Sequence, residues 1–278
     1  MGELLKDKVA VVTGAGQGLG RAEAIELAAQ GAKVVVNDLG TATDGRGSSK
    51  GPAENVVAEI NKADGEAVAN YNSVATIEGA ESIIQTAVDS FGRIDVLVNN
   101  AGFNRDRMIY NISDEEWDSV MKTNLYGTFY TTRAACKVMR QQKYGRIINT
   151  SSHAGLGAMG QANYSAAKEG IVGLTRTVAY DMGRYGVTCN VIRPVSGTRG
   201  FVELVKDKKT LKPFPRRDKV AERLWATIFQ KGVLIYNSTG LAGIDGDALL
   251  IGPPFIIEEN DMDAVVDAID QAMADVLG

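Results

Sequence analysis

The chain has 278 residues, enough for one large domain or two smaller ones with a buried core. Its composition, 45% hydrophobic and 23% charged residues, is typical of a soluble globular protein. The net charge of −4 gives no electrostatic reason to expect binding to nucleic acid or an anionic membrane, and no apolar run reaches the ~20 residues that span a bilayer.

Strand-like and helix-like segments alternate through the first two thirds of the chain. Short apolar and β-branched runs predict six strands, at Val9–Thr13, Lys33–Asn37, Ala67–Tyr71, Ile94–Asn99, Arg146–Thr150 and Val187–Ile192. Helical spacing predicts helices through Ala22–Ala29, at Ala53–Lys62 and Ile77–Phe91, from Ser113 towards Met139, and around Tyr164–Met182. Ser113 and Glu116 form a capping box at the start of the fourth helix. The alternation predicts an α/β fold with a parallel sheet covered by helices on both faces.

Two segments interrupt this alternation. Gly40–Pro52 is rich in Gly, Ser and Thr and is predicted to be an exposed loop. Beyond Pro194 we expect strands at Gly200–Val205, Val233–Tyr236 and Ala248–Ile251, and helices at Lys219–Phe229 and near the C-terminus. The apolar stripe of the last helix consists of Met262, Val265, Val266, Ile269, Met273 and Val276.

A glycine-rich turn, Thr13 to Gly20, lies between the first predicted strand and helix. Gly14 permits the tight turn, Gly18 lets the backbone approach a pyrophosphate, and Gly20 allows close packing of helix on strand. The free N–H groups at the helix start, near Leu19, favour phosphate. Such a turn also occurs without any nucleotide, so the motif alone is weak evidence.

Asp38 strengthens the prediction of a nucleotide site. It follows the second predicted strand, 18 residues after Gly20, where a carboxylate can accept hydrogen bonds from both ribose hydroxyls of NAD and repel a 2′-phosphate. A solvated acidic residue at a strand end is the simpler alternative. Arg46 and Lys50 in the following loop could favour NADP, although we expect them to be solvated. NAD is therefore the predicted cofactor.

Tyr164 and Lys168 are one helical turn apart and therefore on one face of a helix. A free tyrosine, with a pKa near 10, is a poor base at neutral pH, and a nearby cation should lower that pKa. Ser151 and Ser152 end the fifth predicted strand, at the sheet edge where ligands bind in such folds. The Tyr/Lys spacing also occurs by chance on exposed helices, so the prediction of a catalytic pair depends on its combination with the other motifs.

These motifs together resemble the short-chain dehydrogenase/reductase family. The resemblance covers residues 6–198 and rests on the glycine-rich turn, Asn99-Asn100-Ala101-Gly102, Asn124, the serine pair and Tyr164/Lys168, in the family's order and approximate spacing. It implies a Rossmann-type fold and a tetrad of Asn124, Ser152, Tyr164 and Lys168. By this likeness, Tyr164 is the acid/base, Ser152 polarises the carbonyl, Lys168 also holds the nicotinamide ribose, and Asn124 tethers a proton-relaying water. The expected cofactor contacts are Gly14, Gly18, Leu19, Gly20, Asp38, Ser73 and Val74 near the adenine, Asn100, Tyr164, Lys168, and Pro194 at the start of a cofactor loop.

Within the family, the chain is most similar to the 3-hydroxyacyl-CoA dehydrogenase domain of peroxisomal multifunctional enzymes, through residues 37–40, 69–74 and 105–107. Bacterial 3-oxoacyl reductases share residues 160–164, so both subgroups stay open. Asn72 stands where the family usually has Asp. The stretch from Ser152 to Tyr164 is one residue shorter than is usual in the family. Counting back from Tyr164 therefore selects Ser151 as the catalytic serine, whereas aligning the preceding strand selects Ser152. We prefer Ser152 because loops absorb deletions more easily than strands. His153 is expected to be an ordinary loop residue.

The last 80 residues depart from the family. The usual substrate-covering helices and last strand are absent from the sequence, and residues 199–278 resemble the small domain of class III aminotransferases. The pyridoxal-phosphate-binding large domain of those enzymes has no counterpart here, so aminotransferase activity is not expected. We predict a dehydrogenase domain at 1–198 and a small α/β unit at 199–278 that replaces the last strand and the lid.

The leading hypothesis is an NAD-dependent oxidoreductase that interconverts a secondary alcohol and a ketone, with a 3-hydroxyacyl thioester as one candidate substrate. The alternative is an NAD-binding protein without turnover that serves structure or regulation. We expect a homodimer or homotetramer that binds no metal. Cys136 and Cys189 are predicted to be buried thiols, not a disulfide or zinc site. Met1–Lys8 lacks the pattern of a secretory signal, which favours the cytoplasm.

Overall fold

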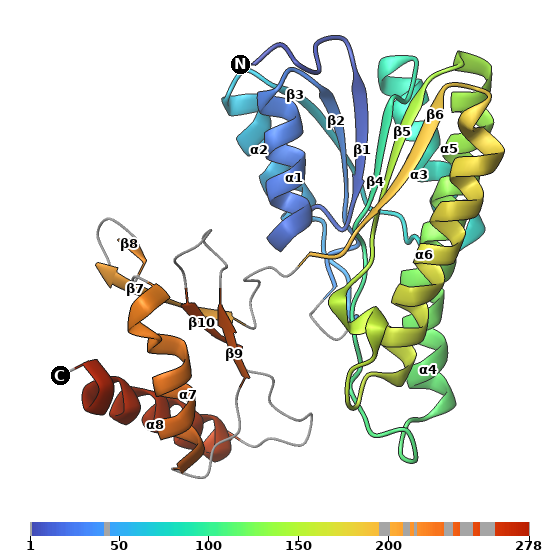
Figure 1. Ribbon diagram of the computed structural model, residues 1–278. Helices are drawn as coiled ribbons and strands as arrows, with labels where there is room; N and C mark the ends of the chain where they lie inside the picture. The colour runs from blue at the N-terminus through green and yellow to red at the C-terminus, as the bar shows by residue number, and fades with distance from the viewer. Residues whose placement is uncertain are drawn as a thin grey trace. The chain divides into compact units, whose positions relative to one another are not determined.

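The computed structural model describes residues 2–41, 45–194, 201–207, 212–213, 216–230, 236–239, 247–250 and 259–277. The chain divides into two compact units, Met1–Pro194 and Val195–Gly278. Figure 1 shows the helices and strands of both units as ribbons.

The first unit contains a six-stranded parallel sheet. Its strands are β1 (Val9–Thr13), β2 (Lys33–Asn37), β3 (Glu66–Asn70), β4 (Val96–Asn99), β5 (Gly145–Thr150) and β6 (Val187–Ile192), in the order β3-β2-β1-β4-β5-β6. Val11 pairs with Val35 of β2 on one side and with Leu97 of β4 on the other. This is the order of a Rossmann-type fold. The predicted fold class is confirmed, and the predicted strand ends differ from the observed ones by at most two residues.

Helices cover the sheet on both faces (Figure 1). The helices of this unit are α1 (Gly18–Ala29), α2 (Gly51–Lys62), α3 (Ile77–Phe91), α4 (Asp114–Met121), α5 (Gly127–Gln142) and α6 (Ala162–Gly183). Alternate residues of β1 and β2 enter opposite cores: Val12 and Val34 pack under α1 and α2, whereas Val11 and Val35 belong to the core formed with α3, α5 and α6. The strands are apolar on both faces because both faces are buried.

The long helix predicted from Ser113 is interrupted. The capping box is present, since Ser113 Oγ accepts from the Glu116 N–H at 3.1 Å and Glu116 Oε2 accepts from the Ser113 N–H at 2.9 Å. A single π-helical turn, η1 (Lys122–Tyr126), then separates α4 from α5. Such insertions are frequent at functional sites, and this one contains Asn124.

The sheet is less covered beyond β5. β6 is the last strand in the described part of the sheet. Thr188, Asn190 and Ile192, on alternate positions of β6, are exposed, Ile192 by 39%. The described helices of this unit therefore leave one face of β6 open.

The second unit is an antiparallel sheet with two helices. Its strands are β7 (Phe201–Asp207), β8 (Lys212–Pro213), β9 (Tyr236–Thr239) and β10 (Asp247–Leu250), in the order β8-β7-β10-β9. Leu224 and Ile228 of α7 (Val220–Gln230) pack with Ala272 of α8 (Glu259–Leu277). Ile269, Met273 and Val276 of the predicted stripe pack against this cluster. Parts of the three predicted strands, namely residues 200, 233–235 and 251, lie outside the described residues.

Three further findings bear on function. In the described part of the chain, no helix is both long and apolar enough to cross a membrane, and no three His, Cys, Asp or Glu side chains gather as metal ligands would. Cys136 is half-buried and Cys189 is buried, and both are free thiols.

Candidate active site

The glycine-rich turn joins β1 to α1 at the carboxyl ends of the strands, where the strand order reverses between β1 and β4. Ligands bind at such switch points. Gly14 (φ 64°) and Gly18 (φ 57°) adopt left-handed conformations that glycine tolerates. A Cβ at Gly14 would lie 2.8 Å from Ala101 Cα, and one at Gly20 would lie 2.4 Å from the Gly14 carbonyl oxygen. Gly18 lies next to Leu19 at the start of α1. A Cβ added at Gly18 would have no described atom within 4 Å, so the space there is open. This cradle fits a pyrophosphate approached by backbone N–H groups.

Asn100 holds the cradle against β4. Its Nδ2 donates to the carbonyl oxygens of Thr13 and Gly14, both at 3.1 Å. Thr13 Oγ1 in turn accepts from the N–H groups of Asn100 and Ala101 at 3.1 Å. Asn100, which was predicted to line the cofactor, therefore shapes the turn itself.

Asp38 lies directly beside the cradle. Its Oδ2 accepts from the Gly16 N–H at 2.7 Å and its Oδ1 from the Gly40 N–H at 2.6 Å. In the loop that follows, Lys50 lies over the Tyr71 ring, with its Nζ 5.1 Å from the ring centroid, and Arg46 is exposed. The Asp38 carboxylate is therefore oriented by backbone N–H groups, one of which belongs to the glycine-rich turn.

The segment after β3 was predicted to lie near an adenine. Val74 is buried, and Ser73 Oγ accepts from the Ala75 N–H at 3.1 Å. Asn72, which replaces the usual Asp, donates from Nδ2 to Ser82 Oγ of α3 at 3.0 Å. Its amide is therefore engaged by the protein itself.

Tyr164 and Lys168 come together on α6 as predicted from their spacing. Lys168 Nζ is 5.4 Å from the centroid of the Tyr164 ring and donates to the Thr150 carbonyl oxygen at 2.8 Å. Burial lowers the pKa of Lys168 to about 8. Burial also raises the pKa of Tyr164, with a smaller contribution from the Asp106 carboxylate, while a hydrogen bond with Ser152 opposes the rise.

This corrects the expectation that Lys168 lowers the pKa of Tyr164. Lys168 is buried and Tyr164 is partly buried, and removal from water disfavours the charged form of each one. The phenol of Tyr164 is therefore protonated at neutral pH.

The two candidate serines have different partners. Ser151 is buried, and its Oγ donates to the Lys168 carbonyl oxygen at 2.7 Å, so it ties the end of β5 to α6. Ser152 accepts from the Ala154 N–H at 3.2 Å and is hydrogen-bonded to Tyr164. His153 is exposed at the start of a short 3-10 turn, η2 (His153–Leu156). Only Ser152 of the pair lies beside the phenol.

Asn124 is fully buried in the π-turn η1. Its Nδ2 donates to the carbonyl oxygens of Phe103 at 2.8 Å and Val120 at 3.0 Å. Its Oδ1 has no hydrogen-bond partner among the described residues, and a Cβ at Gly102 would lie 2.3 Å from that oxygen and 3.4 Å from Lys168 Nζ. A buried acceptor of this kind requires a partner, which a bound water or ligand can supply.

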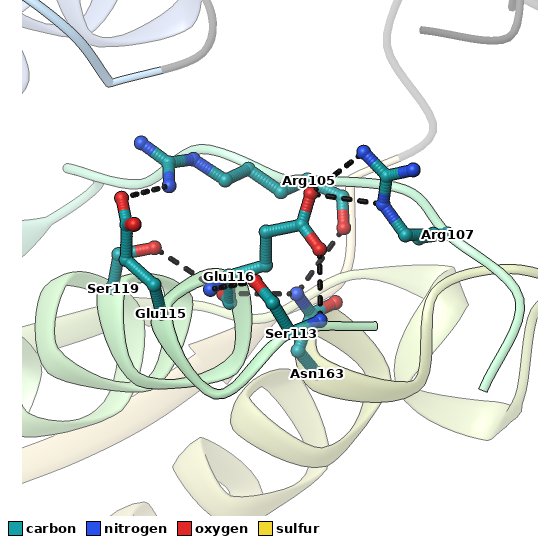
Figure 2. A network of polar contacts seen from close by, with 7 residues as sticks. All are labelled: Arg105, Arg107, Ser113, Glu115, Glu116, Ser119 and Asn163. Carbon is teal, nitrogen blue, oxygen red and sulfur yellow. Dashed lines mark hydrogen bonds and ion pairs between the residues drawn. The ribbon is translucent and has the colours of Figure 1, made fainter. Parts of the chain in front are cut away.

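Pro194 is the last described residue before the gap, and the cofactor loop predicted at 194–197 lies outside the described residues after it. Sequence reasoning assigned no role to the loop segment 105–107 after β4 or to Asn163. Figure 2 shows both in a polar network with Ser113 and Glu116 of α4. The position of Asn163 directly before Tyr164 was the available signal.

The family model described as short chain dehydrogenase matches residues 8–207. A peroxisomal multifunctional enzyme type 2 from Drosophila melanogaster is 54% identical over 193 residues, which cover 69% of this chain and 32% of that protein. A 3-oxoacyl-[acyl-carrier-protein] reductase from Synechocystis is 48% identical over 191 residues, 68% of this chain and 74% of that protein. The chain thus spans about a third of the multifunctional relative.

A crystal structure of a short chain dehydrogenase from Mycobacterium avium has the same fold. It superposes with a TM-score of 0.65 at 54% sequence identity and covers 69% of this chain and 68% of that one.

Proposed function

The chain belongs to the short-chain dehydrogenase family, and on that premise we propose that it is an NAD-dependent oxidoreductase that interconverts a secondary alcohol and a ketone. The observation that carries this proposal is the grouping of Ser152, Tyr164 and Lys168 at the carboxyl end of the sheet, the end at which the glycine-rich cradle also lies. In the proposal, Tyr164 exchanges the hydroxyl proton, Ser152 hydrogen-bonds the carbonyl oxygen, and the free oxygen of Asn124 holds a water near Lys168.

NAD, when bound, supplies the hydride acceptor. The backbone N–H groups of Gly14, Gly18, Leu19 and Gly20 would hold the pyrophosphate, and Asp38 would accept from the ribose hydroxyls. The remaining proposed contacts are Ser73, Val74, Asn100, Tyr164, Lys168 and Pro194. The open space at Gly18 and the oriented Asp38 carboxylate support this assignment.

Because the pKa of Tyr164 is raised, ketone reduction and alcohol oxidation need different protonation states of this residue. A protonated phenol is ready to donate to a ketone, whereas oxidation of an alcohol needs the phenolate as base. We therefore expect alcohol oxidation to accelerate as the pH rises above neutrality, while ketone reduction does not.

For the substrate, we propose a 3-hydroxyacyl thioester and its 3-oxo form. The name of the Synechocystis relative, a 3-oxoacyl-[acyl-carrier-protein] reductase, supports this class. We also propose a homodimer or homotetramer that pairs through the helices around Asn124 and Tyr164. Exposed Tyr126 and Phe129 lie there, and Arg133 stacks on Phe129. The cytoplasm stays our prediction for location, although the multifunctional relatives are named peroxisomal.

One observation favours the alternative, an NAD-binding protein without turnover. The family match ends at Asp207, so the chain from residue 208 onward lies outside that match. The likeness of residues 199–278 to class III aminotransferases stays a prediction.

The test is NADH formation at 340 nm with a panel of secondary alcohols and 3-hydroxyacyl thioesters. We expect Tyr164→Phe to lower turnover by about 10²- to 10⁴-fold, the usual contribution of a general acid/base, while NADH binding survives. Tyr180→Phe is the matched control, since Tyr180 is on the same helix and 88% exposed. Equal activity of Tyr164→Phe and the parent would refute the mechanism. NADH binding without turnover of any substrate would favour the alternative.

A further inference from the structure

Residues 105–107 of the loop after β4 are bound to residues 160–163, at the start of the helix that carries Tyr164. The Arg107 N–H donates to the Gly160 carbonyl oxygen at 2.6 Å. Gln161 Nε2 donates to Asp106 Oδ2 at 2.8 Å, and Asn163 Nδ2 donates to the Arg105 carbonyl oxygen at 3.2 Å. Three consecutive loop residues thus each bond to the segment 160–163.

Asn163 is the centre of this arrangement. It is fully buried, and its amide uses both donors and one acceptor position. Nδ2 also donates to the Glu116 carbonyl oxygen of α4 at 3.2 Å, and Oδ1 accepts from the Tyr164 N–H at 2.7 Å. In Figure 2 the Asn163 side chain lies between the Arg105 segment and the first turn of α4. One side chain therefore joins the loop, α4 and the backbone of the catalytic tyrosine.

The Asn163 side chain also accepts from a backbone N–H group at the start of α6, as the side chain of a helix cap would. The residue before α6, Gln161, caps no backbone N–H with its side chain. The first N–H groups of a helix need partners, and the Asn163 Oδ1 supplies one to Tyr164. The position of Tyr164 thus depends on an amide whose other contacts are outside α6.

Two neighbouring contacts make the attachment rigid. Glu116 Oε1 accepts from Arg107 Nε at 2.9 Å, which ties the far end of the loop segment to α4 (Figure 2). Asn124 Nδ2 holds the Phe103 carbonyl oxygen two residues before Arg105. Two asparagines therefore hold the loop: Asn124 of η1, and Asn163 of α6, the helix that also carries Tyr164.

We propose that Asn163 is a positioning residue, which aligns Tyr164 by holding the first turn of α6 to the loop after β4 and to α4. This inference rests on the proposed function, because it concerns the same acid/base. Asn163 does not touch the reacting atoms in this proposal. It acts through the backbone of Tyr164.

Two substitutions separate the parts of this role. Asn163→Ala removes all three bonds, whereas Asn163→Asp keeps an acceptor for the Tyr164 N–H and loses both donors. If only the cap matters, Asn163→Asp restores activity. If the tie to the loop matters, as we propose, both variants are impaired.

We expect kcat per NADH-binding site to fall about 10- to 100-fold in both variants, the scale of a small misplacement of a catalytic group, with KM and NADH affinity within about threefold of the parent. Deuterium exchange of residues 103–111 and of the start of α6 should be faster in both, without ligand. Asn111→Ala is the control, because Asn111 is an exposed side chain of the same region. Gln161→Ala, which removes only the bond to Asp106, should lower kcat less and serves if the Asn163 variants do not fold.

A kcat within threefold of the parent, or unchanged exchange, would overturn the proposal. A loss of kcat/KM that arises wholly from a higher KM, with kcat unchanged, would also overturn it. A parent that binds NADH but oxidises no alcohol would overturn the proposed function instead, and the exchange measurement would then decide the positioning role alone.

Discussion

The Asp38 carboxylate is oriented by the Gly16 and Gly40 N–H groups before any ligand is present. A preoriented group loses little freedom when it binds. Lys50, one of the two basic residues that could favour NADP, lies over the Tyr71 ring. At the scale of single residues, we therefore predict that cofactor choice depends mainly on Asp38.

We predict that NAD binds more tightly than NADP by ~1–3 kcal/mol, the range for a repelled or unpaired polar group. Titration of both cofactors by protein fluorescence checks this. Asp38→Asn should narrow the difference, and Asp89→Asn, an exposed change on α3, should not. Tighter binding of NADP by the parent would mean that Arg46 or Lys50 outweighs the carboxylate.

Glu23 of α1 is a second residue whose environment has a measurable consequence. Its Oε2 is buried without a hydrogen-bond partner in the described part of the chain, and burial raises its pKa from 4.5 to about 7. The folded state then holds the proton more tightly than the unfolded state, so stability falls as the pH rises from about 4.5 to 7.

We predict that Glu23→Gln is more stable than the parent at pH 8 and equal to it below pH 4.5. The side chain is only half-buried, so we expect a gain on the order of 1–2 kcal/mol after allowance for solvent screening. Urea unfolding at pH 4.5, 6 and 8 measures it, with exposed Glu26→Gln as the control on the same helix. A gain that does not grow with pH would contradict the assignment.

At the scale of elements, the helix ends of the first unit follow local rules, and the π-turn does not. Thr76 Oγ1 accepts from the Gly79 N–H at 3.1 Å and so caps α3, as Ser113 caps α4. The π-turn η1 interrupts a segment with unbroken helical spacing. Asn124 in that turn bonds to Phe103, 21 residues away, which a local pattern cannot anticipate.

We predict that Thr76→Ala lowers the free energy of unfolding by about 1 kcal/mol, the usual cost of losing a cap. Thr76→Ser keeps the hydroxyl and should stay near the parent value. Urea denaturation of the three proteins measures the difference. An alanine variant as stable as the parent would show that the cap contributes nothing to α3.

At the scale of the whole molecule, the described helices of the first unit leave one face of its last described strand, β6, uncovered. β6 is the last strand of its described sheet, and Thr188, Asn190 and Ile192 are exposed on one face. Proteins normally cover such edges and faces, because an open edge pairs with other chains.

We predict that a chain truncated after Thr198 self-associates or precipitates. Light scattering coupled to size exclusion measures its mass against the full-length chain. A second truncation with Ile192→Lys should associate less, since a charge on an open strand opposes pairing. If the truncated chain is instead monodisperse with an unchanged melting temperature and assembly, the C-terminal unit is a passive appendage and this prediction is wrong.

The sequence by itself determined the fold of the first unit. Buried parallel strands are nearly continuous apolar runs and their covering helices repeat every 3.6 residues, so both are visible in local stretches such as 33–37 and 77–91. The glycine-rich turn and the Tyr164/Lys168 spacing are also local, and they predict a candidate site at the carboxyl end of the sheet.

Only the tertiary structure decided how the site residues are used. The sequence left a choice between Ser151 and Ser152, and their partners on α6 distinguish them. The pKa of Tyr164 rises because burial outweighs the hydrogen bond with Ser152, and Asn163 bonds to carbonyl oxygens 47 and 58 residues away. Burial and hydrogen-bond partners are set by chain segments distant in sequence, whereas periodicity and spacing record only the neighbours of each residue.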